Sequence, residues 1–358
     1  MKSRILPILS TLLLLLSGIM PAAGSANTLL NEGIYLIPHP QEVNLGGEDF
    51  ILDREVTIVL DKNASDQDRF TATELAAELK KEWGVRKVNI SNTASGKSII
   101  LTHQGVSKDL LGLPKKKAQQ AYQLSASADQ LVIRAKGDAG LYYGTQTLLQ
   151  VIIENTNGPM IPGMEIADWP DISERAAHYD TKHHQDRREY VESFIRDLAR
   201  YKINMLVWEW EDKFEYPSHP EIGAPGAFTM EEMQEITRYA RQYHVQLVPL
   251  VQGLGHVSYI LKWPQHSHLR EIAASNWEFC PHKDGSYELL GDLWMDAIKA
   301  TPGSDYIHIG TDESYELGKG VECGCQAELE ESSKHAMMTK FISCSVKPLM
   351  KERRTTMA

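Results

Sequence analysis

The sequence predicts an α/β protein with two domains, and two observations support this fold class. Residues from about 33 to 167 mix short strands with two helices, whereas from residue 171 onward strands and helices alternate in a regular order. The chain has 358 residues, 42% of them hydrophobic and 24% charged, and it is long enough to bury a sizeable core. Its net charge of -11 argues against nucleic acid or an anionic membrane surface as a partner.

The N-terminal segment predicts a secretory signal peptide over residues 1–26. Lys2 and Arg4 precede an apolar run at 5–20, and small residues suited to cleavage follow it. A membrane anchor is the alternative, but polar residues and a proline interrupt the run, and polar sequence follows directly. We therefore expect a secreted or periplasmic protein with no membrane span after signal cleavage.

Residues 27–167 predict a small α/β domain with one sheet and helices on one face. Short apolar runs indicate buried strands, an apolar stripe indicates the first helix, and alternation on both sides of a turn indicates a hairpin. The expected elements are strands at 56–60 and 98–102, helices at 71–83 and 140–156, and a hairpin around residues 128–130.

Repeated strand–helix pairs predict a second domain over residues 168–358. Apolar strands that alternate with helices favour a parallel sheet with helices outside it. The expected strands are 176–181, 203–210, 245–252 and 305–310, and the expected helices are 188–201, 229–244, 287–300 and 333–352. A doubly wound sheet and a (β/α)8 barrel both fit this periodicity. No glycine-rich phosphate loop follows the first strand, which disfavours dinucleotide binding, and four units amount to half a barrel.

The ends of these four strands carry ionisable or aromatic side chains, as expected of a polar pocket with aromatic walls that binds sugar. The segments concerned are 180–184, 208–212, 252–256 and the adjacent pair Asp312 and Glu313. Trp208 and Trp210 share one face of their strand and Glu209 has the other, so one of these faces must point into a barrel. Core packing is expected for the other tryptophans of this region, Trp263, Trp277 and Trp294.

The cysteines do not predict a disulfide scaffold or a metal site. Cys280, Cys323, Cys325 and Cys344 are few for a chain of this length. His282 lies near Cys280, yet the spacing matches no standard zinc pattern, and a disulfide or buried thiols are expected instead. A weaker interpretation is a metal-dependent hydrolase that uses histidines at the strand ends. The candidates are His178, His183, His184 and His256, of which His183 and His184 point to opposite faces.

The segment "HIGTDE" at 308–313 resembles the "HIGGDE" strand end of glycoside hydrolase family 20, the β-N-acetylhexosaminidases. Further resemblances cover most of the predicted mature chain. They are "YLIPHPQEV", "GLYYGTQTLLQVI", "IADWPDISERA", "KINMLVWEWEDKFEYP" and "GLGH", which is similar to the family's "PGH". The resemblance implies a small α/β N-terminal domain followed by a (β/α)8 TIM-type barrel, of which only about four βα units are present.

The resemblance also implies a role for the adjacent carboxylates. Family 20 enzymes are retaining exo-hydrolases in which the 2-acetamido oxygen of the substrate is the nucleophile, so no protein nucleophile is needed. Carried over, Glu313 is the general acid and base, and Asp312 stabilises the acetamido group and the oxazolinium. The adjacent Asp312 would help to keep Glu313 protonated. The implied partners are glycans or glycoconjugates that contain N-acetylhexosamine, and no cofactor is expected.

Four further residues are expected to bind substrate: Arg175, Asp212, His256 and Trp210. Several positions depart from the family pattern and put the exact sugar in doubt. These are His183 for Arg, Glu209 for His, Lys213 for Asp, Leu250 and Gln252 for acidic residues, and Thr311 for Gly. A non-catalytic carbohydrate-binding relative of the same fold is therefore the alternative function.

The C-terminal end of the chain leads to a further expectation. The last residues, "RRTTMA", look like the start of a fifth strand. Four βα units leave a barrel sheet with two open edges and an apolar interior without its facing half. We expect this chain to be a fragment without turnover that is poorly soluble or self-associated.

Overall fold

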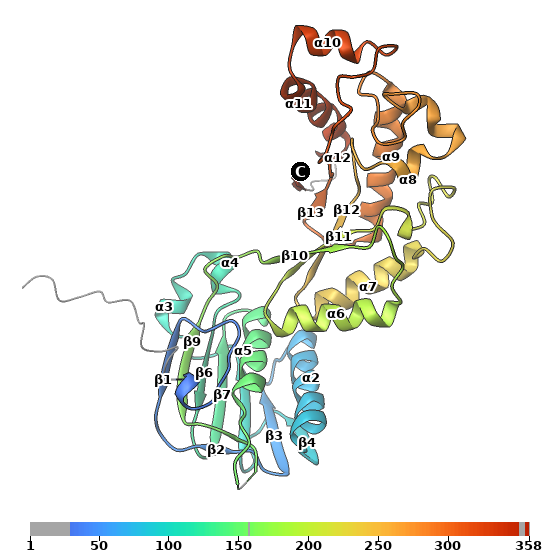
Figure 1. Ribbon diagram of the computed structural model, residues 1–358. Coiled ribbons are helices and arrows are strands. Elements are labelled where there is room, and N and C mark those ends of the chain that lie inside the picture. The colour runs from blue at the N-terminus through green and yellow to red at the C-terminus, as the bar shows by residue number, and fades with distance from the viewer. Residues whose placement is uncertain (1–28, 157, 351–354, 358) are drawn as a thin grey trace, which may run out of the picture. The chain divides into compact units, whose positions relative to one another are not determined.

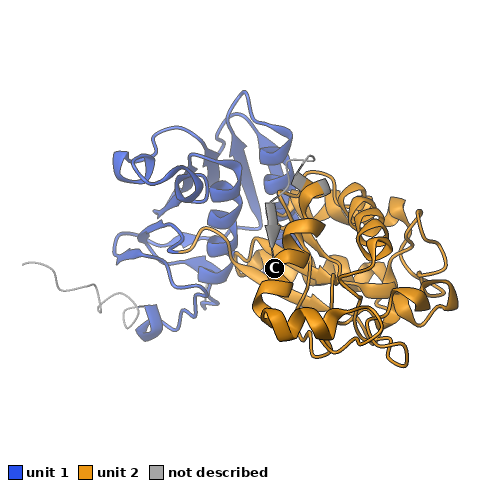
Figure 2. Cartoon of the chain, turned by 90° about the horizontal axis from the view of Figure 1, so that it is seen from above, with its two compact units in different colours: residues 1–171 blue, residues 172–358 orange. Residues whose placement is uncertain are grey.

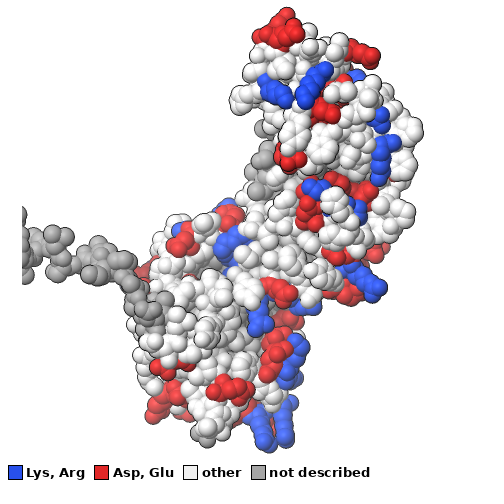
Figure 3. All heavy atoms as spheres, in the orientation of Figure 1, with Lys and Arg blue, Asp and Glu red and all other residues white. Residues whose placement is uncertain are grey.

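The computed structural model describes residues 29–156, 158–350 and 355–357, so the predicted signal peptide lies outside the described residues. The chain divides into two compact units, residues 1–171 and residues 172–358 (Figure 2). No helix in the described ranges is both long and apolar enough to cross a membrane. On the face seen in Figure 3, Lys and Arg side chains lie among Asp and Glu side chains and form no basic patch.

Unit 1 is a seven-stranded sheet with two long helices packed side by side on one face (Figure 1). The strand order is β1 (Glu42–Leu45), β9 (Met164–Asp168), β6 (Tyr122–Ala126), β7 (Gln130–Ala135), β5 (Ser98–Thr102), β3 (Glu55–Leu60) and β4 (Lys87–Ser91). The helices are α2 (Asp66–Trp83) and α5 (Asp138–Val151). The smaller elements are the pair β2 (Phe50–Ile51) and β8 (Met160–Ile161), and the short helices α3 (Lys108–Leu111) and α4 (Lys115–Ala118).

Helix α2 begins earlier than the apolar stripe predicts because a capping box fixes its first turn. The Ser65 hydroxyl accepts from the Asp68 backbone N–H, and the Asp68 carboxylate accepts from the Ser65 N–H. The helix ends at Gly84, whose left-handed backbone (φ 66°) suits glycine. Apolar side chains such as Leu75 and Leu79 then cover the sheet.

Unit 2 contains a parallel sheet in the order β10 to β14. The strands are β10 (Ala176–Asp180), β11 (Met205–Glu209), β12 (Gln246–Leu250), β13 (Tyr306–His308) and β14 (Thr355–Met357). The long helices α6 (Arg188–Arg200), α7 (Met230–Gln242) and α9 (Asp284–Ala300) follow the first three strands. The sequence thus predicts the four βα units correctly, and the fifth strand that it suggests at the C-terminus is present as β14, paired with β13.

Shorter elements complete unit 2. After β11 and β12 come η1 (Glu211–Lys213), α8 (Ser258–Leu261) and η2 (Pro264–Leu269), and after β13 come α10 (Cys325–Glu331), α11 (Lys334–Ser345) and α12 (Lys347–Met350). The helix predicted at 333–352 is therefore two helices with a break before Pro348, which cannot donate a backbone hydrogen bond. In the part of the chain that the structure describes, β10 and β14 are the edge strands of this sheet.

The two faces of the unit 2 sheet differ in what they contact. The rings of Tyr179 of β10 and Trp208 of β11 pack at a tilt against each other and face the helices, since Tyr179 also contacts Phe194 of α6. The opposite face, called the inner face below, carries His178, Glu209 and an apolar cluster. That cluster comprises Met205, Val207, Val248 and Leu250, with Tyr306 packed against it. The cluster residues are each less than 10% exposed, so the inner face shows less open apolar surface than the sequence suggests.

Candidate active site

The carboxylate pair lies on a strained loop directly after β13. Gly310 (φ 67°), Thr311 (φ 85°) and Glu313 (φ 48°) all have left-handed backbone, which is unusual for a β-branched residue such as Thr311. A side chain at Gly310 would collide with the Gln252 amide. The resulting turn leaves the side chain of Asp312 60% exposed and that of Glu313 49% exposed, so both carboxylates are open to a ligand.

His256 joins the two carboxylates. Its Nε2 lies 3.1 Å from the Glu313 Oε2 and 3.4 Å from the Asp312 Oδ2, although neither contact has good hydrogen-bond geometry. The "GLGH" segment reaches this position because its glycines approach the next loop closely. A Cβ at Gly253 would lie 2.5 Å from the Ile309 carbonyl, and one at Gly255 would lie 2.6 Å from the Asp312 carbonyl.

Two aromatic side chains form a wall beside the pair. Trp277 donates from Nε1 to the Glu313 carbonyl at 3.0 Å, and its ring lies 4.5 Å from His256 and stacks with Tyr315 at 6.3 Å. A hydrogen bond from the Tyr315 hydroxyl to the Glu313 carboxylate raises the pKa of Tyr315. The expectation that Trp277 packs in the core is wrong, because Trp277 lies on an irregular loop where no periodicity assigns a face.

Two buried glutamates hold the rest of this loop in place. The Glu271 Oε1 accepts from the backbone N–H groups of Lys319 (2.8 Å) and Gly320 (3.0 Å), and Glu278 accepts from the N–H of Glu316. Burial raises the pKa of Glu278 to about 7 and also raises that of Glu271. The segment that carries Trp277 therefore fixes the loop that carries the carboxylate pair.

A second polar cluster occupies the inner face at the ends of β10, β11 and β12. Glu209, 2% exposed, accepts from Gln252 Nε2 at 2.6 Å, and it lies 3.1 Å from His178 Nε2 and 3.4 Å from Lys182 Nζ. Burial raises the pKa of the neighbouring Glu211 to about 8, and the charge of Glu209 adds to the shift. Two positions that depart from the family pattern, Glu209 and Gln252, are thus hydrogen-bonded partners.

His308 of β13 lies between this cluster and the carboxylate pair. Burial lowers its pKa, as does the charge of His178, while Asp312 and Glu209 act in the opposite direction. Its Nδ1 accepts from the Gly310 N–H at 3.1 Å. His308 is therefore a site residue that the sequence analysis missed. It could have been found from its position, since it ends β13 in register with Leu250 of β12.

The structure does not bring the remaining predicted residues to the carboxylate pair. Asp212 accepts from Lys213 and, at 3.1 Å, from Lys262. Burial raises the pKa of Asp212, but the hydrogen bonds from the two lysines outweigh it and lower the pKa overall. Among the described residues, the carboxylate of Asp212 pairs with these two lysines and not with His256, Asp312 or Glu313 of the site.

Trp210 requires a correction. It is 0% exposed, donates to the Tyr216 hydroxyl at 3.1 Å and packs against Trp208 and Phe214. It lies in the aromatic core because Trp208, two residues earlier, faces the helices and Trp210 follows the same alternation. Glu209 instead supplies the inward-facing side chain of this strand end.

Arg175 lies at the opposite end of its strand from the other predicted residues. It precedes β10, and the five-residue strand places about 16 Å of backbone between it and the carboxyl end. Its guanidinium donates to the carbonyls of Lys202 (2.7 Å) and Ile172 (2.9 Å). These bonds hold Arg175 at the entry of the strand, and the structure does not bring it to the pair.

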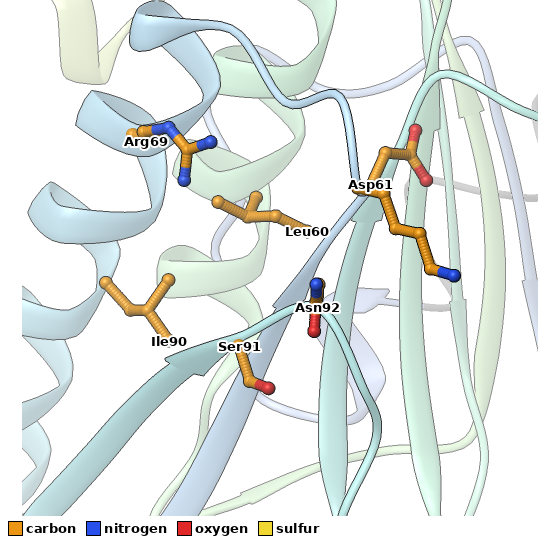
Figure 4. A pocket seen from close by; sticks show the side chains of 7 residues that line it. Leu60, Asp61, Arg69, Ile90, Ser91 and Asn92 are labelled. Atoms are coloured by element: carbon orange, nitrogen blue, oxygen red, sulfur yellow. The ribbon is translucent and has the colours of Figure 1, made fainter.

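The histidines considered for a metal do not converge. Within the described ranges, His178 pairs with Glu209, His184 with Asp186 at 3.1 Å, and His256 with the carboxylate pair. A pocket of about 220 Å³ lies in unit 1, beside the ends of β3 and β4 (Figure 4). Its lining includes Asp61, Arg69 and Asn92, which all belong to unit 1, and none of the predicted site residues.

Comparisons with known proteins agree on one family. The domain described as "Glycosyl hydrolase family 20, domain 2" matches residues 33–169, and "Glycosyl hydrolase family 20, catalytic domain" matches residues 173–358. The β-hexosaminidase of Porphyromonas gingivalis is 26% identical over 358 residues, which cover 90% of this chain and 44% of that protein. Hexosaminidase D of Bos taurus is 30% identical over 161 residues, 45% of this chain and 46% of that protein.

Solved structures show the same fold. A chitobiase from Flavobacterium johnsoniae superposes with a TM-score of 0.79 at 22% identity, covering 91% of this chain and 52% of that chain. An N-acetyl-β-hexosaminidase from Streptomyces plicatus, in complex with Thio-NAglucal, has a TM-score of 0.73 at 24% identity and covers 90% and 64%. The chain spans about half the length of the curated relatives described above.

Proposed function

This chain belongs to glycosyl hydrolase family 20, and we propose that its activity is that of a retaining exo-β-N-acetylhexosaminidase. The substrates are glycans or glycoconjugates that end in N-acetylhexosamine. Names of relatives support this sugar class, among them a chitooligosaccharidolytic β-N-acetylglucosaminidase of Bombyx mori and a lacto-N-biosidase of Bifidobacterium bifidum.

The observation that carries the proposal is the adjacent, exposed pair Asp312 and Glu313 on the strained loop after β13. Retaining enzymes with a protein nucleophile place their acid and nucleophile about 5–5.5 Å apart on the two sides of the scissile bond. Asp312 and Glu313 instead both lie against one nitrogen, His256 Nε2. They suit a reaction in which the substrate supplies its own nucleophile. The 2-acetamido oxygen then bonds to the anomeric carbon as the glycosidic bond breaks.

Each carboxyl has one task in this reaction. Glu313 gives its proton to the leaving oxygen, and Asp312 accepts from the acetamido N–H and stabilises the positive oxazolinium that forms. Water then attacks the anomeric carbon and Glu313 takes its proton. The bond between that carbon and the acetamido oxygen breaks, and the sugar leaves with retained configuration. Tyr315 donates to the Glu313 carboxylate, His256 Nε2 lies 3.1 Å from it, and Trp277 offers an apolar wall to the acetamido group or the ring.

We also propose that the protein is secreted or periplasmic. The basic residues Lys2 and Arg4, the apolar run after them and the small residues up to Ala26 support export.

A carbohydrate-binding protein without turnover is the second candidate. The altered strand ends favour it, because Glu209 and Gln252 bind each other and Asp212 is neutralised by Lys213 and Lys262. Groups engaged in this way are less available to orient a sugar for hydrolysis.

One assay separates these functions. The purified chain is incubated with p-nitrophenyl N-acetylglucosaminide and with the corresponding glucoside, which lacks the acetamido group. A chain with family 20 activity should hydrolyse the first substrate only, and Asp312→Asn should lower that rate by about 10²-fold or more, whereas a fragment without turnover should hydrolyse neither. Equal hydrolysis of both substrates would contradict the substrate-assisted reaction.

The same assay tests the expectation that this chain has no turnover. No hydrolysis, combined with binding of an N-acetylglucosamine thiazoline in calorimetry, would support the binding protein. Neither hydrolysis nor binding would contradict both candidates for the chain as it stands.

A further inference from the structure

Three cysteine sulfurs meet beside the loop that carries the carboxylate pair. Cys280 Sγ lies 3.6 Å from Cys325 Sγ, and Cys323 Sγ lies 3.0 Å from Cys325 Sγ, with all three sulfurs within 4.8 Å of one another. Cys280 and Cys325 are fully buried and Cys323 is partly exposed. The sequence spacing gave no such indication because 42 residues separate the first two cysteines.

We propose that Cys280, His282, Cys323 and Cys325 form a structural zinc site. The four residues come from two short motifs, Cys-Pro-His and Cys-Gly-Cys, and make a Cys3His ligand set that zinc favours. The proposal does not depend on the hexosaminidase activity.

His282 has the surroundings of a zinc ligand. Its Nδ1 lies 2.9 Å from the carbonyl of Cys323, and a Cβ on the neighbouring Gly324 would lie 3.7 Å from that nitrogen. Its Nε2 bonds to the Glu328 carboxylate, which Lys340 holds at 2.9 Å. Histidines that bind metal commonly donate their other ring N–H to a carboxylate, which fixes the tautomer and orients the ring. Zinc binding through Nδ1 requires the ring to turn this nitrogen from the Cys323 carbonyl toward the sulfurs.

A metal accounts for the cluster better than a disulfide does. A tetrahedral site with Zn–S bonds of about 2.3 Å spaces its sulfurs about 3.7 Å apart. The 3.6 Å between Cys280 and Cys325 is close to this spacing, and the 3.0 Å between Cys323 and Cys325 would have to widen on metal binding. A disulfide would use two of the sulfurs and leave the third thiol buried against it.

Zinc at this position would connect two segments that build the site. Cys280 and His282 directly follow Trp277 and Glu278, and the Cys-Gly-Cys turn ends the loop that begins at the carboxylate pair. The hydrogen bonds from the backbone of residues 316–320 to Glu271 and Glu278 already join the same segments. The metal would therefore fix the end of the loop that lies beyond these hydrogen bonds.

The test uses the full chain, purified with its thiols reduced, and measures metal content and free thiols. We expect about one zinc per chain by plasma mass spectrometry. Replacement by cobalt should give the visible bands of a tetrahedral site and strong near-ultraviolet thiolate charge transfer. Cys323→Ser removes the partly exposed ligand with least risk to folding and should abolish stoichiometric zinc. Cys344→Ser, which changes the cysteine outside the cluster, is the matched control and should leave the zinc content unchanged.

His282→Gln should keep the charge transfer but weaken zinc binding at least tenfold against a competing chelator. Three results would overturn the proposal. The first is purified protein without zinc that also fails to bind cobalt. The second is cobalt binding without thiolate charge transfer. The third is a disulfide between two of the three cysteines, mapped by mass spectrometry in the unreduced protein.

Discussion

Units 1 and 2 treat their buried polar groups differently. In unit 1 the Asp68 carboxylate accepts from the Ser65 N–H and pairs with His103 at 2.9 Å, and the Tyr122 hydroxyl bonds to both Thr147 and Asp168. Most buried side-chain atoms without a hydrogen bond in the described structure lie in unit 2, among them Gln252 Oε1, His256 Nε2 and Trp263 Nε1, whereas unit 1 has Thr71 Oγ1. Unsatisfied polar groups cost stability, so their accumulation near the strand ends indicates a function there.

The backbone shows the same contrast. All non-glycine residues with positive φ in the described ranges lie in unit 2. Lys202 and His244 simply end helices α6 and α7, but Glu211, His256, Thr311 and Glu313 all follow strands at the edge with the carboxylate pair. Strain of this kind persists only where surrounding structure enforces it, and it concentrates at functional sites. The difference indicates that the strained backbone and the unsatisfied polar groups at this edge of unit 2 belong to a functional site, whereas unit 1 shows little of either.

The largest effect is expected from the substitution that removes the proposed general acid. Glu313→Gln should lower kcat/KM by about 10²–10⁴-fold for substrates with poor leaving groups, and less for activated aryl glycosides, which need little protonation. Steady-state hydrolysis of both substrate types measures this. Glu322→Gln, an exposed change on the same loop, is the control. An equal loss for both types would remove Glu313 from the role of general acid.

A second experiment distinguishes a tryptophan of the buried core, Trp210, from one that lies beside the carboxylate pair, Trp277. Trp210→Ala should lower the free energy of unfolding of unit 2 by about 3–5 kcal/mol, because it empties a fully buried aromatic site. Trp277→Ala should cost less than about 1.5 kcal/mol, since this ring is only half-buried, while it weakens thiazoline binding. Urea unfolding and calorimetry measure the two effects. A larger stability loss from Trp277→Ala would place that ring in the core after all.

The third prediction concerns pH in unit 1. The hydrogen bond to Asp68 raises the pKa of His103 from 6.5 to about 9. The pair therefore contributes its full share to the stability of the folded state below pH 6.5, and this contribution is lost as the pH rises through about 9. With the His103 side chain 30% exposed, we expect a loss of about 1–2 kcal/mol over this window. Urea unfolding of wild type at pH 6 and pH 10, compared with His103→Gln, measures it. His39→Gln is the control on an exposed histidine, and a His103→Gln variant with unchanged pH dependence would contradict the assignment.

The smallest effect is expected from a substitution that relieves backbone strain at the site. Thr311→Gly should raise the stability of unit 2 by up to about 1 kcal/mol, because relief of a left-handed β-branched residue outweighs the added chain entropy of glycine. Ser314→Gly, on the same loop without a positive φ, should not stabilise. Thermal melts of the two variants decide this, and a destabilised Thr311→Gly would mean that its side-chain contacts matter more than the strain.

The sequence alone determined the order of the βα units and the position of the carboxylate pair. Both follow from local signals: the apolar strands repeat at regular spacing, and Asp312 and Glu313 directly follow one of them, so any parallel sheet must place the pair at its carboxyl edge. The resemblance of "HIGTDE" and five other segments then indicated the family before any fold was known.

Only the tertiary structure decided which side chains surround the pair. Alternation along β11 predicts that Trp208 and Trp210 lie on the face opposite Glu209, but it does not predict which face meets the helices. In the structure the tryptophan face packs on the side of α6. Trp277 and the three clustered cysteines lie on irregular loops, where no period assigns a direction. Their convergence depends on contacts across 36 to 45 residues of chain. The periodicity of the sequence predicts which face of a strand or helix a side chain occupies. Which side chains from distant loops meet depends on how the whole sheet and its connections pack.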